Sequence, residues 1–278
     1  MGQPIPLVVF GPNPDSWLVC YGRRFTHTNV PASLIEMIQS GKLAPMSLEF
    51  VSLHLNGRSW VARNFATGDI SWSNDVDPNI IDHLKGNNGK PKAQFVSFCG
   101  DGEGHFLKHV AAGGWDGTFP DNYPHKIFDL RKQFSDFDQG LRGIIFGSGG
   151  THLYSLETGF SAELSGKADD PNHPLYKALS EQAALGSGWT VDLTSSICFY
   201  DPQYFLLRFR KGNTIQWKLS LPNNMQNALT ELMRVAETPE ERTELQKEEL
   251  VIRQQQEAQA QLRLAVAQSQ AVCNSLFH

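Results

Sequence analysis

Aromatic and imidazole side chains recur at one position of a motif that repeats along the chain. These side chains, each followed by an apolar residue, are those of Trp17, Trp60, His105, His152 and Tyr204. Alternate residues of a strand share a face, so the residues four places later lie on the same side. The polar residues among these are Tyr21, Asn64, His109 and Arg208. Such a face could stack a sugar or planar ligand and hydrogen-bond its edges. The alternative is that these side chains fill the space between repeats, which is the commoner role of repeated aromatics.

A glycine-rich stretch next to one of these residues could hold a metal ion. Asp101, Glu103 and His105 alternate with glycines, and carboxylate and imidazole groups are metal ligands. A Gly-Asp-Gly-Glu-Gly stretch is also an ordinary polar hairpin turn, and the other repeats lack these acids. The sequence therefore favours a turn, and we expect no metal and no other cofactor.

Catalytic motifs are absent from the sequence. Ser148 lies in a Phe-Gly-Ser-Gly-Gly stretch that lacks the first glycine of the nucleophile elbow. Asp69, Asp101, Asp116 and Glu157 could approach one another in a ring, as in a carboxylate-pair hydrolase, but they occupy different positions of the repeat. No phosphate loop, dinucleotide fingerprint or zinc-ligand spacing is present.

The repeating unit has three markers that recur five times in the same order. An apolar triplet ends at Phe10, Leu53, Phe98, Phe146 and Phe199. A turn and a second strand follow, and the second strand ends at Gly22, Gly68, Gly113, Gly159 and Gly212. A proline then precedes an apolar run of helical period, at Pro31, Pro78, Pro124, Pro174 and Pro222. Successive hairpins predict a three-stranded meander, and a proline at the first helical position predicts a helix after it.

We therefore expect a mainly β fold with α-helices. Five β-β-β-α units, closed into a propeller-like toroid, span residues 5–236, with approximate bounds 5–46, 47–92, 93–140, 141–192 and 193–236. One unit cannot bury its apolar strand face alone, so neighbouring units must stack. Closure of the ring removes exposed sheet edges. An open ββα solenoid is the alternative.

The order of triplet, turn, aromatic-apolar strand, glycine and third strand is clearest in residues 143–154. It resembles the repeats of five-bladed propeller-like proteins, including lectins of the tachylectin-2 type. Those lectins have no helix in each unit, and in this respect the chain is more similar to repeats of functionally unassigned fungal proteins. The resemblance implies an architecture for residues 5–236 and transfers no site residue.

The segment 237–278 differs in composition from the repeats and is rich in Gln and Glu. Thr238 followed by Pro239 and Glu241 predicts the start of a long helix. Leu245 and Ile252 fall on a seven-residue register, but polar residues interrupt it, so a strict coiled coil is not predicted. The helix could dock along the ring, pair with a second copy to make a homo-oligomer, or be solvated.

Composition limits the possible partners. A formal net charge of -5 gives no broad basic field, which argues against nucleic-acid binding. The first residues lack the pattern of a secretory signal. No apolar run is close to the length of about 18 residues that a membrane-spanning helix needs. Cys20, Cys99 and Cys198 lie in apolar strand patterns typical of buried reduced thiols, so we expect a cytoplasmic protein.

We expect a non-enzymatic binding or interaction scaffold that presents loops and a polar-aromatic cavity to a protein or carbohydrate ligand. A carbohydrate-binding lectin is the first alternative. The second is a hydrolase or lyase with its site in the central cavity.

Overall fold

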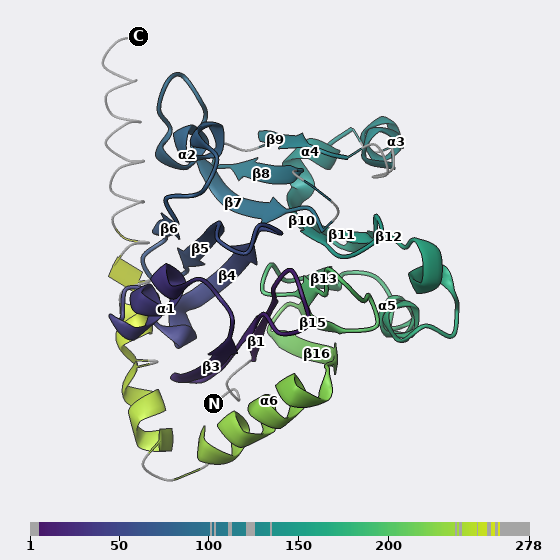
Figure 1. Ribbon diagram of the computed structural model, residues 1–278. Helices are drawn as coiled ribbons and strands as arrows, with labels where there is room; N and C mark the ends of the chain where they lie inside the picture. Colours follow the sequence, from purple (N-terminus) through teal and green to yellow (C-terminus); the bar gives the residue numbers. More distant parts are fainter. Residues whose placement is uncertain are drawn as a thin grey trace.

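The computed structural model describes residues 6–100, 102, 104–110, 113–120, 126–133, 135–236, 238, 241–248, 250–254, 257–258 and 261. Within these residues the chain forms several small antiparallel sheets joined by short helices, which confirms the expected mixture of strands and helices (Figure 1). No helix among them is long and apolar enough to cross a membrane.

The first three sheets each contain three strands in the order of the chain. Sheet 1 consists of β1 (Leu7–Phe10), β2 (Trp17–Tyr21) and β3 (Arg24–Thr28), followed by α1 (Ala32–Gln39). Sheet 2 consists of β4 (Leu48–Leu53), β5 (Trp60–Asn64) and β6 (Ile70–Trp72); η1 (Pro45–Ser47) precedes it and α2 (Pro78–Lys85) follows. Sheet 3 consists of β7 (Ala93–Phe98), β8 (His105–His109) and β9 (Trp115–Thr118), followed by α3 (Lys126–Gln133) and α4 (Phe137–Gly140).

The last two sheets follow the same plan with additions. Sheet 4 consists of β10 (Leu141–Phe146), β11 (His152–Leu156) and β12 (Phe160–Glu163), followed by η2 (Gly166–Asp169) and α5 (Pro174–Ala184). Sheet 5 has four strands, β13 (Thr190–Val191), β14 (Ser196–Ile197), β15 (Phe205–Lys211) and β16 (Thr214–Ser220), and α6 (Asn223–Ala236) follows it.

The end of the first strand pairs with the start of the second in the same register in four sheets. The paired residues are Phe10 and Trp17, Leu53 and Trp60, Phe98 and His105, and Phe146 and His152. The expected fifth pair is wrong by one residue. Ile197 pairs with Phe205, and Cys198 N donates to Tyr204 O, so Cys198 takes the anchor position that was expected for Phe199.

The shift in sheet 5 has a local cause. The first strand is split into β13 and β14, which pair with different parts of β15. Between them Ser195 N donates to Asp192 O, and Arg208 N donates to Ser195 Oγ in place of a backbone carbonyl. Asp192 and Ser195 are residue types common in turns, but the segment has neither glycine nor proline, which are the strongest sequence signals of a turn.

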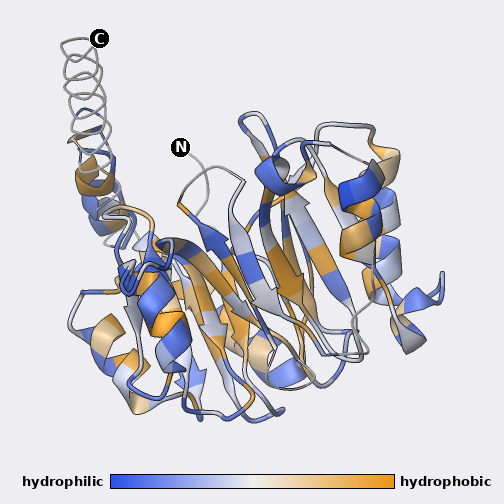
Figure 2. Ribbon diagram, turned by 90° about the horizontal axis from the view of Figure 1, so that it is seen from above, coloured by the Kyte–Doolittle hydropathy of each residue, from blue (hydrophilic) through white to orange (hydrophobic). Residues whose placement is uncertain are grey.

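Each long helix packs between its own sheet and the next one. In α1, Leu34 and Ile38 contact residues of both sheet 1 and sheet 2. In the same way, the apolar face of α2 lies between sheets 2 and 3, and that of α5 lies between sheets 4 and 5. The apolar face of α6, with Met225 and Leu229, joins sheet 5 to sheet 1. Hydrophobic residues therefore concentrate along the strands, and hydrophilic ones in loops and on outer helix faces (Figure 2).

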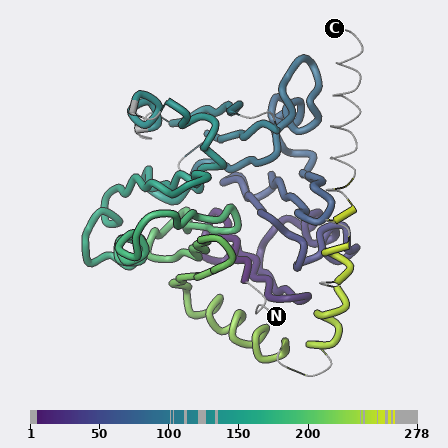
Figure 3. Tube along the Cα trace, turned by 180° about the vertical axis from the view of Figure 1, so that it is seen from behind, coloured from purple at the N-terminus to yellow at the C-terminus, as the bar shows by residue number. Residues whose placement is uncertain are grey.

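The innermost strands contact one another in sequence. Contacts join β1 to β4, β4 to β7, β7 to β10, β10 to β14, and β14 back to β1. Serine hydroxyls form hydrogen bonds between three of these strand pairs. Ser97 Oγ donates to Ile144 O (2.6 Å) between β7 and β10, and Ser196 Oγ donates to Val8 O (2.6 Å) between β14 and β1. Phe98 N donates to Ser52 Oγ (3.2 Å) between β7 and β4. Figures 1 and 3 agree that α6 lies beside the N-terminal strands.

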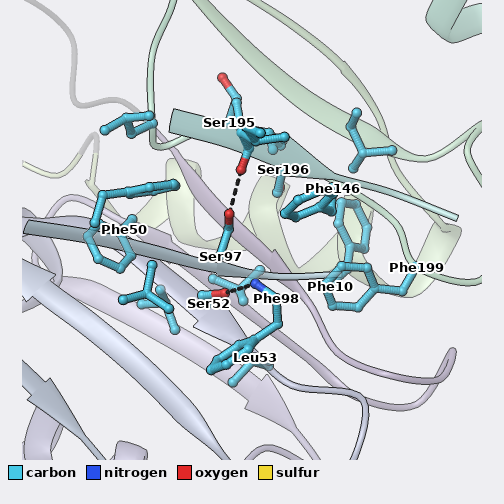
Figure 4. Close-up of a pocket in the computed structure, with 18 residues that line it drawn as sticks. Phe10, Phe50, Ser52, Leu53, Ser97, Phe98, Phe146, Ser195, Ser196 and Phe199 are labelled. Atoms are coloured by element: carbon cyan, nitrogen blue, oxygen red, sulfur yellow. Dashed lines mark hydrogen bonds between the residues drawn. The ribbon is translucent and has the colours of Figure 1, made fainter. Parts of the chain in front are cut away.

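A narrow channel runs between these innermost strands (Figure 4). Its volume is ≈ 60 Å³, and it is lined by first strands from sheets 1 to 5. Phe10, Phe98, Phe146 and Phe199 occupy it together with apolar and serine side chains. A space of this size holds little more than water, so the centre of the molecule is packed rather than open.

Part of the C-terminal segment docks on sheet 1. Residues 241–248 and 250–254 are helical. Leu245 is 6% exposed and packs with the cluster formed by sheet 1 and α6. Arg23, in the β2–β3 turn, pairs with Glu248, and Arg24, the first residue of β3, pairs with Glu241. Residues 262–278 lie outside the described part of the chain.

Candidate functional site: a polar cavity between sheets 2 and 3

Most of the residues expected to bind a ligand are buried in side-chain contacts. Trp60 is 1% exposed, and its Nε1 donates to Ser33 Oγ at 2.9 Å. His152 is 2% exposed; its Nε2 lies 2.8 Å from the Tyr154 hydroxyl and its Nδ1 lies 2.8 Å from Gly150 O. Trp60 thus joins sheet 2 to α1, and His152 is bonded within its own strand and the turn before it.

The remaining predicted residues are similarly placed. Asn64 Oδ1 accepts from Ala66 N (2.8 Å) and closes a turn. Trp17 and Tyr21 are buried in the cluster between sheets 5 and 1, and Tyr204 packs against it. Arg208 pairs with Asp192 and His109 stacks on His83, so neither lies in the central channel.

One predicted residue, His105, does line a large cavity. The cavity has a volume of ≈ 680 Å³ and lies between sheets 2 and 3, on the side of the turns that join first and second strands. Its polar side chains include His54, Asn56, Asp75, Asp77 and His105. Phe98, Phe119 and Pro120 supply apolar surface.

Sheet 2 and the start of α2 form one wall of the cavity. Asn56 Oδ1 accepts from Ser59 N (2.8 Å), and Ser59 Oγ donates to Asp75 O (2.7 Å), which ties the β4–β5 turn to the loop before α2. Asp77 is the N-cap of α2, and its Oδ1 accepts from Asn79 N at 2.7 Å. The two exposed carboxylates, of Asp75 and Asp77, are therefore held in place by a fixed backbone.

Sheet 3 forms the opposite wall, where the chain passes very close to the backbone of Gly104. A Cβ atom at Gly104 would lie 2.6 Å from Pro120 Cδ, 2.7 Å from Cys99 Sγ and 2.7 Å from Thr118 O. Only glycine fits there without displacing backbone. Gly104 therefore lets the chain after β9 lie against the start of β8, which brings Phe119 and Pro120 to the cavity beside His105.

Burial controls the charge of His105. Desolvation lowers the pKa of this imidazole below its ordinary value, against the opposing attraction of Asp116 and Asp77. His105 is therefore neutral at neutral pH and can both donate and accept a hydrogen bond. Asp75 and Asp77 are the only ionisable acids that line the described part of the cavity, and no lysine or arginine lines that part.

Behind the cavity, two histidines stack between α2 and sheet 3. The rings of His83 and His109 are nearly parallel, with centroids 5.3 Å apart. His83 Nδ1 lies 3.2 Å from Pro91 O, and its Nε2 lies 3.4 Å from Asp116 Oδ2. These contacts attach α2, which supplies Asp77 to the cavity, to β9.

The described residues include only one of the three metal candidates, so the expectation for the group stays a prediction. Among the described residues, no cluster of three or more His, Cys, Asp or Glu side chains is arranged to hold a metal ion. His105 lies in the cavity wall, whereas Asp101 and Glu103 are outside the described residues. Of the carboxylates considered for hydrolysis, Asp69, Asp116 and Glu157 do not line the cavity, and Asp101 is again outside the described part.

Sequence reasoning missed Asp75 and Asp77. The signal was available for Asp77, because an aspartate directly before a proline-initiated helix is a typical N-cap. No pattern in the sequence places that N-cap beside the β8 residue His105.

Comparisons of the chain with protein-family models, curated proteins and solved structures find no match.

Proposed function

We propose that this protein is a non-enzymatic binding protein whose ligand is a small polyhydroxylated molecule such as a sugar. The observation that carries the proposal is the ≈ 680 Å³ cavity with carboxylate, amide and imidazole groups on its walls and Phe119 beside them. Its volume falls within the range of about 300–1,000 Å³ that small-molecule sites occupy.

The chemistry of the lining favours hydroxyl groups over anions. Asp75 and Asp77 accept hydrogen bonds and would repel a negatively charged ligand. His105 and Asn79 offer groups that match the donor and acceptor character of a hydroxyl. An aromatic ring such as Phe119 can pack against the apolar face of a sugar ring. The same site would serve the lectin-like function expected as an alternative from sequence.

A closed, propeller-like ring would be the rigid scaffold for this site. The proposal of closure is supported by the contacts of β14 with β1 and by α6, which buries Leu229 between sheets 5 and 1. In an open solenoid those faces would be at opposite ends of the stack. Part of the cavity surface consists of turns, so ligand chemistry can vary there without changing the core.

A glycan array probed with multivalent protein tests the ligand class. We expect binding to one group of glycans, followed by a titration of the best hit by calorimetry. Asp75→Asn keeps the shape of the side chain but removes its charge, and should weaken binding by about tenfold or more, since hydrogen bonds to charged groups contribute about 1.5–3 kcal/mol. Asp15→Asn, an exposed aspartate on the β1–β2 turn of sheet 1 and outside the cavity, is the control and should bind normally.

Two results would reject the proposal. The first is an array without hits at protein concentrations suited to weak binding. The second is a hit whose affinity is equally unaffected by Asp75→Asn, Asp77→Asn and the Asp15→Asn control.

A further inference from the structure

A second set of polar side chains lies at the start of the innermost strands. The pairing of first and second strands is irregular at one place in sheets 2, 3 and 4, between Leu48 and Phe50, Ala93 and Phe95, and Leu141 and Gly143. The residues that these bulges leave outside the ladder are Glu49, Gln94 and Arg142. In sheet 5, Asp192 occupies the corresponding place, at the turn between β13 and β14. Bulges of this kind re-aim a side chain and often occur next to binding sites.

Apolar residues directly after the bulges close the end of the central channel. Phe50, Phe95 and Leu193 all line the channel, and the rings of Phe50 and Phe95 meet edge to face with centroids 4.7 Å apart. A Cβ atom at Gly143 would lie 2.7 Å from both Leu193 Cδ2 and Phe95 Cε1. The polar bulge side chains are therefore separated from the channel by a packed apolar layer.

Arginine side chains pair with two of these four residues, Glu49 and Asp192. Arg63 Nη1 lies 2.9 Å from Glu49 Oε2, and Asp192 Oδ2 lies 3.2 Å from Arg210 Nη2 and 3.5 Å from Arg208 Nε. The two pairs and Arg142 lie at the same end of the channel, because the residues that follow the bulges, Phe50, Phe95 and Leu193, all line it, and the charges of Asp192 and Arg142 both act on the pKa of Glu49. We call Glu49, Arg63, Arg142, Asp192, Arg208 and Arg210 the basic rim.

The basic rim has more positive charge than its acids neutralise. Four guanidinium groups face two carboxylates, a formal surplus of two positive charges. Within the described chain, Arg142 makes no hydrogen bond or ion pair, and the buried Nε atom of Arg63 lacks a hydrogen-bond partner, whereas Arg208 Nε has only the ion-pair contact with Asp192. The side chains of Arg63 and Arg208 are only 18% and 14% exposed, so their charges are weakly screened.

We propose that the basic rim is a binding site for an oxyanion, the phosphate or carboxylate group of a small ligand. Guanidinium groups match the geometry of such anions and form strong charge-assisted hydrogen bonds with them. An oxyanion bound here neutralises the surplus charge and accepts hydrogen bonds from the guanidinium group of Arg142, which has no other partner in the described chain. This site is separate from the sugar cavity, which lies on the side of the turns joining first and second strands, and its test is independent of that proposal.

The test uses the full chain with inorganic phosphate, and with succinate as the carboxylate probe, at constant ionic strength. Thermal unfolding and calorimetry should show one anion bound per chain, with a rise in Tm, because a ligand that binds only the folded state stabilises it. Preference for phosphate or for succinate identifies the kind of ligand. Arg142→Gln should weaken binding by about tenfold or more.

A substitution of opposite effect makes the test sharper. Glu49→Gln removes the acid that competes for the arginines, so it should tighten anion binding. Arg58→Gln, on an exposed turn outside the basic rim, should leave it unchanged. If Arg142→Gln does not fold, tighter binding by Glu49→Gln still supports the site. Absence of binding to both anions, or equal affinity of all variants, would overturn the proposal.

Discussion

At the scale of single residues, Gly104 determines how the cavity wall is built. Gly104→Ala should lower the free energy of unfolding by about 1–3 kcal/mol, the usual cost of overpacking, since Thr118 O and the Pro120 ring occupy the space of a Cβ atom. Urea unfolding measures this change. Gly140→Ala is the control, because nothing lies within 4 Å of a Cβ at Gly140, which ends a short helix. An equal loss in both variants would contradict the role of close approach at Gly104.

A half-buried histidine, His105, and a buried one, His109, make stability depend on pH. Burial lowers the pKa values of His105 and His109 below their ordinary 6.5. Below about pH 6.5 the unfolded chain therefore binds protons that the folded chain does not, so stability falls as the pH decreases from 7 toward 5. The double variant His105→Gln, His109→Gln should lose less stability over this range than the unchanged protein. Tm measured at several pH values checks this, and an equal loss in both proteins would disprove it.

Glu49 contributes to the pH dependence with the opposite sign. Burial raises the pKa of this carboxyl above its ordinary 4.5, and the attraction of Arg63 only partly opposes the shift. The folded chain therefore holds the Glu49 proton more tightly than the unfolded chain does. As the pH rises from 4.5 through the raised pKa of the folded state, the contribution of Glu49 to stability decreases. Because a glutamine amide does not titrate, the Glu49→Gln variant proposed for the anion test also removes this contribution.

At the scale of elements, Leu245 attaches the C-terminal segment to sheet 1. Leu245→Ala should cost about 2–5 kcal/mol of docking energy, as is typical for a buried leucine. The loss should appear as faster amide hydrogen exchange in residues 241–254, with little change in the sheets. Leu250→Ala is the control, because Leu250 is 55% exposed. Unchanged exchange in Leu245→Ala would show that the segment is held by other contacts.

Helix starts could be predicted from sequence because they depend on local chemistry. Pro78 and Pro174 occupy the first turn of α2 and α5, as expected. Pro31 instead lies one place earlier, as the N-cap of α1. Pro124 is outside the described residues. Thr238 Oγ1 accepts from Glu241 N at 3.4 Å, in agreement with the predicted cap of the C-terminal helix.

Contacts between distant segments could not be predicted in this way. Arg23 pairs with Glu248, which is 225 residues away, and no local pattern links them. The split of the first strand in sheet 5 was missed because its turn, with Asp192 and Ser195, has neither glycine nor proline. The cavity was missed for a related reason, since its two walls come from different sheets and only packing brings Asp77 close to His105.

At the scale of the whole molecule, the junction between α6 and sheet 1 tests ring closure. Leu229 is 1% exposed, and Leu229→Ala should cost about 2–5 kcal/mol. In a closed ring this loss spreads to all sheets, so amide exchange in β7 and β8 should accelerate together with exchange in β1. In an open stack the effect would be confined to the terminal units. Leu185→Ala, at a position 55% exposed, should change neither.

The bulges of sheets 2, 3 and 4 also affect how this fold can change by mutation. Glu49, Gln94 and Arg142 differ in charge, although they stand at one equivalent place beside a layer of tightly packed side chains. Because a bulged residue is outside the ladder, its replacement does not alter the pairing of its neighbours. These positions are therefore suited to directed evolution: a library that randomises them together can search for new ligand preferences while the strand pairing of the scaffold is kept.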